Sequence, residues 1–225
     1  MSETRTALIA GASGLVGGHA LTRLLASPAY GRVIAVTRKR LLIEHPKLLQ
    51  IVTSLDAVES AVASFGTRVD DAYCALGTTI KITGSQEAFR HVDFDYVVGF
   101  ARAAKKAGAT RFQLVSAMGA SAKSTIFYSR VKGEAEEAVS ALGFVALHIF
   151  RPGMLLGARA EPRPLEAIVG ALTPLLNPLM IGGAAAYRSI GGDAVADAMV
   201  AAALGDGEGR RVLTYREMVG PAGLN

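Results

Sequence analysis

Three evenly spaced glycines near the start of the chain constrain its fold more than any other feature. The apolar run 7–10 leads directly into Gly11, Gly14 and Gly17, and the amphipathic stretch 15–25 overlaps the end of this loop. In a strand–loop–helix element of this kind, the glycines allow a tight turn, close approach of backbone to a pyrophosphate, and close helix–strand packing. The helix N-terminal amides then face the anion. The loop therefore predicts a dinucleotide site. Its expected residues are Gly11, Ala12, Ser13, Gly14, Leu15, Val16 and Gly17.

Short apolar runs alternate with longer amphipathic stretches along the chain. Repeated units of this kind predict parallel strands joined by right-handed crossover helices. We expect a doubly wound, mostly parallel α/β sheet with helices on both faces, the Rossmann fold, as one domain over residues 1–225. Residues 152–225 are expected to form the substrate side of its cleft. The expected strands are 7–10, 33–37, 49–52, 72–76, 112–116 and 144–150, and the expected helices include 15–25, 86–106 and 193–204.

The cysteine content and the N-terminal residues indicate in which cellular compartment the protein is expected. Cys74 is the one cysteine among 225 residues, which excludes an internal disulfide and a multi-cysteine metal site. Its apolar surroundings predict an inert, buried thiol. The N-terminal residues run straight into the glycine loop without the pattern of a signal peptide. On these grounds we expect a cytoplasmic protein.

One uncharged stretch, residues 167–187, is about long enough to span a bilayer. Pro174 and Pro178 interrupt it, and prolines free backbone groups that lipid does not satisfy. We therefore expect no spanning helix here but a buried or cleft-lining segment, and leave its contact with a membrane surface open.

Charge at the end of the second expected strand indicates which dinucleotide binds. The chain carries a net charge of +5, which attracts anions in general. Thr37 and Arg38 stand where NAD-binding folds place an acid for the ribose 2′-hydroxyl, and Arg38 can instead receive a 2′-phosphate. This favours NADP(H). A solvated basic turn is the alternative, and nucleic acid is disfavoured because no interleaved aromatic residues accompany the charges.

A tyrosine and a lysine four residues apart suggest catalysis. Tyr128 and Lys132 share one face of an expected helix, and a nearby ammonium favours the phenolate, so the pair can exchange a proton. Ser116 ends the fifth expected strand at the cleft edge, where its hydroxyl can orient a carbonyl. Core packing of the tyrosine beside a solvated lysine is the alternative.

These motifs together resemble the short-chain dehydrogenase/reductase superfamily, through GASGLVG from Gly11, the strand-end Ser116 and YSRVKGEAE from Tyr128. More narrowly, CALGTT, VDFDYV and FRPGMLLG are similar to its atypical branch, which contains the HIV-Tat-interacting oxidoreductase. The resemblance implies hydride transfer from NADPH to a carbonyl, with Tyr128 supplying the proton, Ser116 polarising the oxygen and Lys132 holding the nicotinamide ribose.

The resemblance also implies further cofactor contacts and shows two departures. Asp93 stands where many relatives have an asparagine, and its carboxylate can relay protons or only cap the helix. The acid that many relatives place beside the adenine is displaced here, with Asp56 as the nearest candidate. The implied cofactor contacts after the fourth and sixth strands are Ala75, Leu76, Gly77, Thr78, Pro152, Gly153 and Met154.

The sequence thus predicts an NADPH-dependent oxidoreductase acting on a small carbonyl or related substrate. The alternative is an NADP(H)-binding regulatory or assembly protein with little turnover, since a fold does not fix function. A sugar-nucleotide epimerase is disfavoured because roughly seventy residues follow Arg151, too few for a nucleotide-sugar pocket. The histidines lack metal-ligand spacing, so no metal is expected. A small-molecule partner is expected, and homo-oligomer formation is left open.

Overall fold

The computed structural model describes residues 4–156 and 188–220. Its main sheet has seven strands, all parallel, in the order β3-β2-β1-β4-β5-β6-β9. A short parallel pair, β7 with β8, lies apart from it. The strands are β1 (Arg5–Ala10), β2 (Tyr30–Thr37), β3 (Leu48–Val52), β4 (Asp71–Cys74), β5 (Arg111–Val115), β6 (Ala146–Phe150), β7 (Leu155–Leu156), β8 (Ile190–Gly191) and β9 (Gly209–Leu213).

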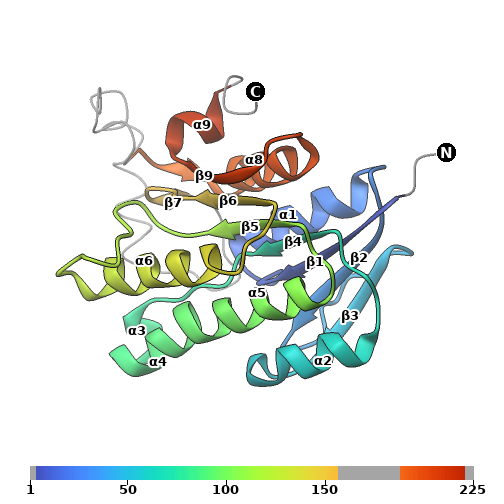
Figure 1. Ribbon diagram of the computed structural model, residues 1–225, viewed down its shortest axis with the longest axis horizontal. Helices are drawn as coiled ribbons and strands as arrows, with labels where there is room; N and C mark the ends of the chain where they lie inside the picture. The colour runs from blue at the N-terminus through green and yellow to red at the C-terminus, as the bar shows by residue number, and fades with distance from the viewer. Residues whose placement is uncertain (1–3, 157–187, 221–225) are drawn as a thin grey trace.

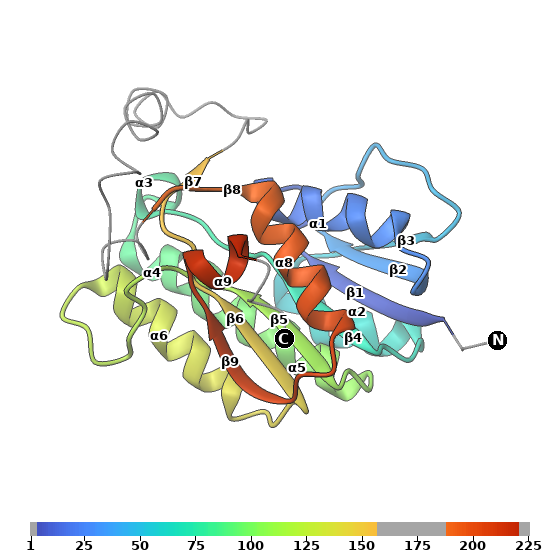
Figure 2. The ribbon, with the colours of Figure 1, turned by 90° about the horizontal axis from the view of Figure 1, so that it is seen from above.

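Helices cover both faces of this sheet (Figure 1). On one face lie α2 (Val58–Phe65), α5 (Tyr96–Lys106) and α6 (Phe127–Ser140). On the other lie α1 (Leu15–Ala26) and α8 (Gly192–Leu204), which pack side by side (Figure 2). The predicted doubly wound fold in a single domain is therefore confirmed.

Alternation along the strands builds the two cores. In β1, Leu8 packs into the cluster beneath α2, α5 and α6, and its neighbour Ile9 packs into the cluster beneath α1 and α8. Successive strand residues point to opposite faces, so a strand buried on both sides reads as one continuous apolar run. This is why the strand positions were visible in the sequence.

Two details differ from the sequence-based expectation. The expected helix 86–106 is divided into α4 (Gln86–Arg90), a π-helical turn (His91–Asp95) and α5. Strand β9 was not predicted, because its sequence, GRRVL, is charged and its first two residues are exposed at the sheet edge. The remaining short helices are α3 (Ile80–Thr83) and α9 (Tyr215–Val219).

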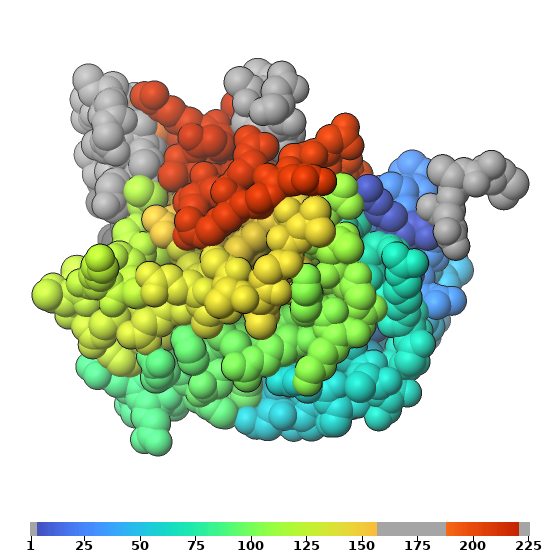
Figure 3. All heavy atoms as spheres, viewed as in Figure 1, coloured from blue at the N-terminus to red at the C-terminus, as the bar shows by residue number. Residues whose placement is uncertain are grey.

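The connections place a topological switch point at the carboxyl ends of β1 and β4, the expected position of a ligand crevice. The chain runs outward from β1 through β2 and β3, then returns to add β4 on the opposite side of β1. Such a switch point is where open α/β sheets bind ligands. At the far side of the sheet, the red residues of α8 and β9 lie against the yellow residues around β6 (Figure 3), which closes the core there.

Membrane crossing was considered for residues 167–187, which lie outside the described residues. Within the ranges 4–156 and 188–220, no helix is both long and apolar enough to cross a bilayer.

Candidate functional site

The three glycines of the first loop have separable roles. Gly11 has a φ of +83°, and a Cβ there would lie 2.4 Å from the Ala75 carbonyl oxygen. A Cβ on Gly17 would lie 2.0 Å from the Gly11 carbonyl oxygen, so both positions require glycine for packing. At Gly14 the nearest atom to an added Cβ is the Gly11 carbonyl oxygen at 3.3 Å. No other atom of the described residues lies within 4 Å of that Cβ position, so the space at Gly14 is otherwise open.

Helix α1 begins directly at this open face. Gly14 is its N-cap residue, and no side chain of the described residues caps the first amides. Backbone N–H groups at a helix N-terminus, together with the helix dipole, attract anions. The open face and the uncapped amides fit a pyrophosphate. The loop residues Ala12 and Val16 are buried, and Ser13 and Leu15 lie nearer the surface.

The segment after β4 touches both the glycine loop and α6. The Ala75 N–H donates to the Ala10 carbonyl at 2.9 Å, which joins the ends of β4 and β1. Gly77 lies over α6, since a Cβ there would be 3.4 Å from Lys132 Nζ. Residues 75–78, which include Leu76 and Thr78, thus lie between the predicted phosphate loop and the predicted catalytic lysine.

The end of β2 presents a basic side chain to solvent. Thr37 is buried, whereas Arg38 is exposed immediately beyond it. An exposed guanidinium at this strand end fits a ribose phosphate, because it forms charge-assisted contacts with anionic oxygens.

Tyr128 and Lys132 lie together near the start of α6. The Tyr128 ring is half-buried and packs on the buried Phe89, with 5.5 Å between ring centroids. Lys132 is buried, and its Nζ lies 2.7 Å from Oδ1 of Asp93. The other oxygen of Asp93 accepts a 2.9 Å hydrogen bond from the Thr78 N–H. Asp93 therefore does not cap the helix; it joins Lys132 to the segment after β4.

The charge state of Lys132 follows from these neighbours. Burial lowers the pKa of its ammonium group, but attraction to Asp93 and to Tyr128 outweighs burial and raises that pKa above its ordinary value. The lysine is accordingly charged across the physiological pH range.

Ser116 follows β5 as predicted, but its hydroxyl is directed elsewhere. The hydroxyl donates a 2.6 Å hydrogen bond to Oε1 of Glu136, a carboxylate buried in α6. Arg151, the residue after β6, donates to both oxygens of Glu136 at 2.9 and 2.5 Å. Ser116 and Lys132 both border one narrow gap that has no room for a water molecule. The Ser116 hydroxyl, which was expected to donate a hydrogen bond to a carbonyl, donates it to Glu136 in this structure.

The residues after β6 complete the crevice wall. The Met118 N–H donates to the Pro152 carbonyl at 2.9 Å, so the segments after β5 and β6 are joined. Pro152 is buried, Gly153 is half-buried, and the Met154 side chain is 41% exposed. These predicted contacts thus border the same edge of the sheet as Ser116.

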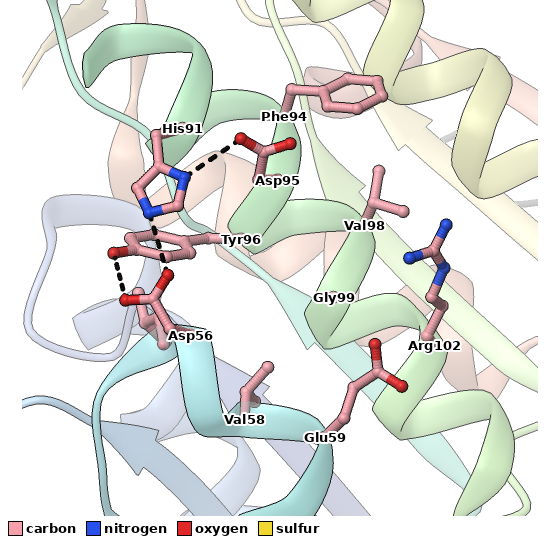
Figure 4. Close-up of a pocket in the computed structure, with 11 residues that line it drawn as sticks. Asp56, Val58, Glu59, His91, Phe94, Asp95, Tyr96, Val98, Gly99 and Arg102 are labelled. Carbon is pink, nitrogen blue, oxygen red and sulfur yellow. Dashed lines mark hydrogen bonds and ion pairs between the residues drawn. The ribbon is translucent and has the colours of Figure 1, made fainter. Parts of the chain in front are cut away.

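Asp56, the candidate adenine contact, is engaged in a separate cluster (Figure 4). Its carboxylate lies 2.9 Å from His91 Nε2 and accepts a 3.0 Å hydrogen bond from the Tyr96 hydroxyl. His91 also contacts Asp95 at 3.1 Å, and that hydrogen bond together with the charge of Asp56 raises the pKa of His91. These groups border a surface cavity of about 320 Å³ between α2 and α5. Apart from Asp56, none of its lining residues belongs to the predicted cofactor site.

Cys74 and His148 are both buried in the core. Burial raises the pKa of the Cys74 thiol to about 12, so the thiol is inert as predicted. Burial also lowers the pKa of His148 to about 4, which keeps that imidazole neutral beside Gln113. Among the described residues no group of three histidine, cysteine or acidic side chains is arranged to hold a metal ion.

The fold and the crevice define an NAD(P)-binding Rossmann protein of the oxidoreductase-like class. Residues 11–173 match the family described as NAD(P)H-binding, and the chain belongs to this family. The predicted resemblance to short-chain reductases and to the HIV-Tat-interacting branch is thereby confirmed.

Curated relatives identify the branch. The chain is 38% identical over 194 residues to "Protein fmp52, mitochondrial" of Emericella nidulans, covering 82% of this chain and 83% of the relative. It is 35% identical over 167 residues to "Protein HTATIP2" of Rattus norvegicus, covering 73% and 68%. These names give no substrate.

Solved structures support the fold alone. UDP-glucose 4-epimerase of Thermotoga maritima has a TM-score of 0.71 at 18% identity, covering 93% of this chain and 76% of the epimerase. WbmH of Bordetella bronchiseptica, solved in complex with NAD+, has a TM-score of 0.70 at 17% identity, covering 95% and 76%.

The cytoplasmic location is wrong, because several matching relatives are named as mitochondrial proteins. That expectation rested on a single cysteine and on the N-terminal pattern. A single cysteine excludes an internal disulfide, but it does not distinguish one reducing compartment from another.

Sequence reasoning missed two members of the crevice. Glu136 lies one turn beyond Lys132 on α6, so the spacing of four residues that paired Tyr128 with Lys132 also indicated it. Arg151 directly follows β6 and carried no comparable signal. Their contact with Ser116 depends on strands far apart in the sequence meeting in the sheet.

Proposed function

We propose that this protein is an NADPH-dependent oxidoreductase that reduces a small carbonyl or a related substrate. The observation that carries the proposal is the buried Lys132 ammonium one helical turn from Tyr128, beside the segment after β4. Burying a charged group costs free energy, so the buried ammonium of Lys132 suggests a functional role for this residue.

The chain's own residues have distinct tasks in this proposal. The amides after Gly14 bind the pyrophosphate, and Arg38 binds the 2′-phosphate that separates NADP(H) from NAD(H). When bound, NADPH supplies the hydride. Lys132 binds the nicotinamide ribose, and Tyr128 donates a proton to the carbonyl oxygen. Residues 152–154 border the nicotinamide side.

Ser116 is proposed as the residue that orients the carbonyl, with a condition set by Glu136. Its hydroxyl has one proton, which the carboxylate holds in this structure. To donate to a substrate, the hydroxyl must rotate away from Glu136. We therefore expect Ser116 to contribute less to the rate than Tyr128.

The test is a screen of small aldehydes and ketones with NADPH, followed by nicotinamide absorbance. On any substrate found, Tyr128→Phe should slow turnover about 100-fold or more, the usual contribution of a positioned acid, with NADPH affinity nearly unchanged. Tyr30→Phe, at the amino end of β2 and so at the opposite edge of the sheet, is the matched control and should keep full activity where it is folded. Full activity of Tyr128→Phe would remove the proposed role.

A second candidate is an NADP(H)-binding regulatory or assembly protein. The engagement of Ser116 with Glu136 favours it, because a binding protein needs no free hydroxyl at that place. Tight NADPH binding with no reduction of any carbonyl in the screen would support this candidate over the enzyme.

A further inference from the structure

Two neighbouring strand ends bring Asp56 to the same part of the sheet as Arg38. The Thr53 N–H, just after β3, donates a 2.9 Å hydrogen bond to the Thr37 carbonyl at the end of β2. Arg38 follows Thr37 directly. Asp56 follows Thr53 by three residues, in the 3₁₀ turn Leu55–Ala57. The carboxylate of Asp56 and the guanidinium of Arg38 therefore belong to one corner of the sheet, the β2–β3 corner.

Tyr96, the first residue of α5, interacts with both of these charged groups. Its hydroxyl donates a 3.0 Å hydrogen bond to Asp56. Burial and that hydrogen bond raise the pKa of Tyr96, and the positive charge of Arg38 opposes part of the rise. The guanidinium is thus within electrostatic reach of the phenol that Asp56 holds. A phosphate bound by Arg38 would accordingly be influenced by the charge at Asp56.

The imidazole of His91 bridges two carboxylates at the β2–β3 corner (Figure 4). Its Nε2 lies 2.9 Å from Asp56, and its Nδ1 lies 3.1 Å from Asp95. The ring packs on Tyr96 with 4.4 Å between ring centroids. A protonated imidazole carries an N–H on both nitrogens, whereas the neutral ring has one. Because both neighbours are acceptors, His91 can donate to both only when it is charged.

His91 is the group in this cluster whose charge changes near neutral pH. The groups that face it are Asp95 from the π-helical turn, Asp56 from the 3₁₀ turn and Tyr96 from α5. The hydrogen bond to Asp95 and the charge of Asp56 outweigh burial and raise the pKa of His91. Tyr96 stays neutral there, since its own pKa is raised above that of a free phenol. Loss of the His91 proton leaves the two carboxylates with no imidazolium to offset them.

We propose that His91 is a positioning residue for cofactor choice, whose imidazolium holds Asp56 and offsets its charge so that Arg38 can accept a 2′-phosphate. This inference rests on the proposed function, in which Arg38 binds the 2′-phosphate of NADPH. A phosphate monoester carries about −1.5 to −2 charge at neutral pH, and a carboxylate nearby repels it. The 2′-hydroxyl of NADH is uncharged. Loss of the His91 proton should therefore weaken NADPH binding and leave NADH binding nearly unchanged.

The first test measures NADPH and NADH affinity by calorimetry at low ionic strength, for the natural protein and for His91→Gln. At pH 6.5, His91→Gln should weaken NADPH binding about two- to fourfold, the effect of one unit charge on a phosphate roughly 10 Å away in a water-like dielectric. At pH 8.5 the natural protein has lost most of that charge, so the two proteins should agree. Ionisation of the phosphate itself affects both proteins alike. Equal NADPH affinity at pH 6.5, or an equal loss of NADPH and NADH affinity, would overturn the proposal.

Asp56→Asn tests the β2–β3 corner in the opposite direction. Asparagine keeps an acceptor for the Tyr96 hydroxyl and removes the negative charge, so the ratio of NADPH to NADH affinity should rise by a similar factor. Glu59→Gln is the matched control. It also removes an acidic charge from the wall of the cavity, but Glu59 lies at the other end, beside Arg102, and pairs with Lys106 (Figure 4). An unchanged or lower ratio in Asp56→Asn, or an equal rise in Glu59→Gln, would contradict the proposal.

A third readout follows His91 in the natural protein. Coupling between two binding events is reciprocal, so NADPH should raise the pH at which His91 titrates by about 0.3–0.6 units, which corresponds to the two- to fourfold effect. NMR of the ring C–H signals measures this shift, with His91 assigned by its loss in His91→Gln. NADH should cause no comparable shift. An unmoved titration at saturating NADPH would overturn the proposal.

These measurements separate the two levels of the account. A natural protein that binds NADPH and NADH equally would remove the assignment of Arg38 to the 2′-phosphate, and this inference with it. A preference for NADPH that His91→Gln leaves unchanged at pH 6.5 would remove the inference on His91 and keep the assignment of Arg38.

Discussion

Two glycines of the loop, Gly14 and Gly17, can be compared by replacing each with alanine, which adds one methyl group. In Gly17→Ala, the new Cβ would lie 2.0 Å from the Gly11 carbonyl oxygen and 2.6 Å from its carbon, so backbone must move. In Gly14→Ala, the nearest atom is 3.3 Å away, and the φ of −86° at Gly14 suits alanine. The same substitution should therefore affect folding at one position and cofactor binding at the other.

The expected magnitudes follow from these contacts. Overpacking costs about 1–3 kcal/mol, and alanine in a helix regains up to about 1 kcal/mol, so Gly17→Ala should destabilise by about 1–2 kcal/mol. For a domain of this size that lowers Tm by about 2–8 °C. Gly14→Ala should cost about 0.5 kcal/mol as a poorer N-cap, but its methyl group meets the pyrophosphate. We expect it to weaken NADPH binding at least about tenfold, or 1.4 kcal/mol.

Thermal unfolding followed by circular dichroism and calorimetric NADPH titration measure the two effects separately. Gly17→Ala should lower Tm, because backbone of the loop must move to admit the methyl group. Gly14→Ala should keep nearly the natural Tm and lose NADPH affinity. If Gly14→Ala keeps full NADPH affinity, the loop does not bind the pyrophosphate as described.

Three further predictions address other contacts. Arg38→Ala should weaken NADPH by about 1.5–3 kcal/mol and leave NADH unchanged in calorimetry; equal affinity of the natural protein for both cofactors would contradict the assignment. Ser116→Ala should lower the free energy of unfolding in urea by about 1.5–3 kcal/mol, because a hydrogen bond to the buried Glu136 carboxylate is lost; an unchanged value would oppose that contact. His91→Gln should lower the free energy of unfolding by less than about 1 kcal/mol, since the ion pairs of His91 are exposed. The pKa of His91 is raised, so this contribution is complete below about pH 6.5 and is lost as pH rises through the folded pKa. In urea denaturation, His91→Gln should therefore be less stable than the natural protein at acidic pH and equally stable at alkaline pH.

Features determined by local sequence were predictable. The alternation of apolar runs with amphipathic stretches, and the glycines after β1, follow from rules that act within about twenty residues. The spacing that placed Tyr128 and Lys132 on one helix face is equally local. These signals were sufficient for the fold class, for the glycine loop after β1 and for placing Tyr128 and Lys132 on one helix.

Features that depend on tertiary contacts were not predictable. Strand β9 is charged and half-exposed, and it becomes a strand by pairing with β6 rather than by its own pattern. The partner of the Ser116 hydroxyl, Glu136, is set by how β5 packs against α6. Asp93 was noted as a departure from relatives, but its contact with Lys132 required the π-helical turn that no local rule indicated.

The most direct test of the proposed function is transfer of a labelled hydride. NADPH carrying deuterium at both hydrogen positions of nicotinamide C4 is incubated with the protein and a carbonyl substrate from the screen, and the alcohol is analysed by mass spectrometry. We predict deuterium on the former carbonyl carbon, formed at least about 100-fold more slowly by Tyr128→Phe. An alcohol without deuterium, or equal rates of label transfer by the two proteins, would contradict the reductase mechanism.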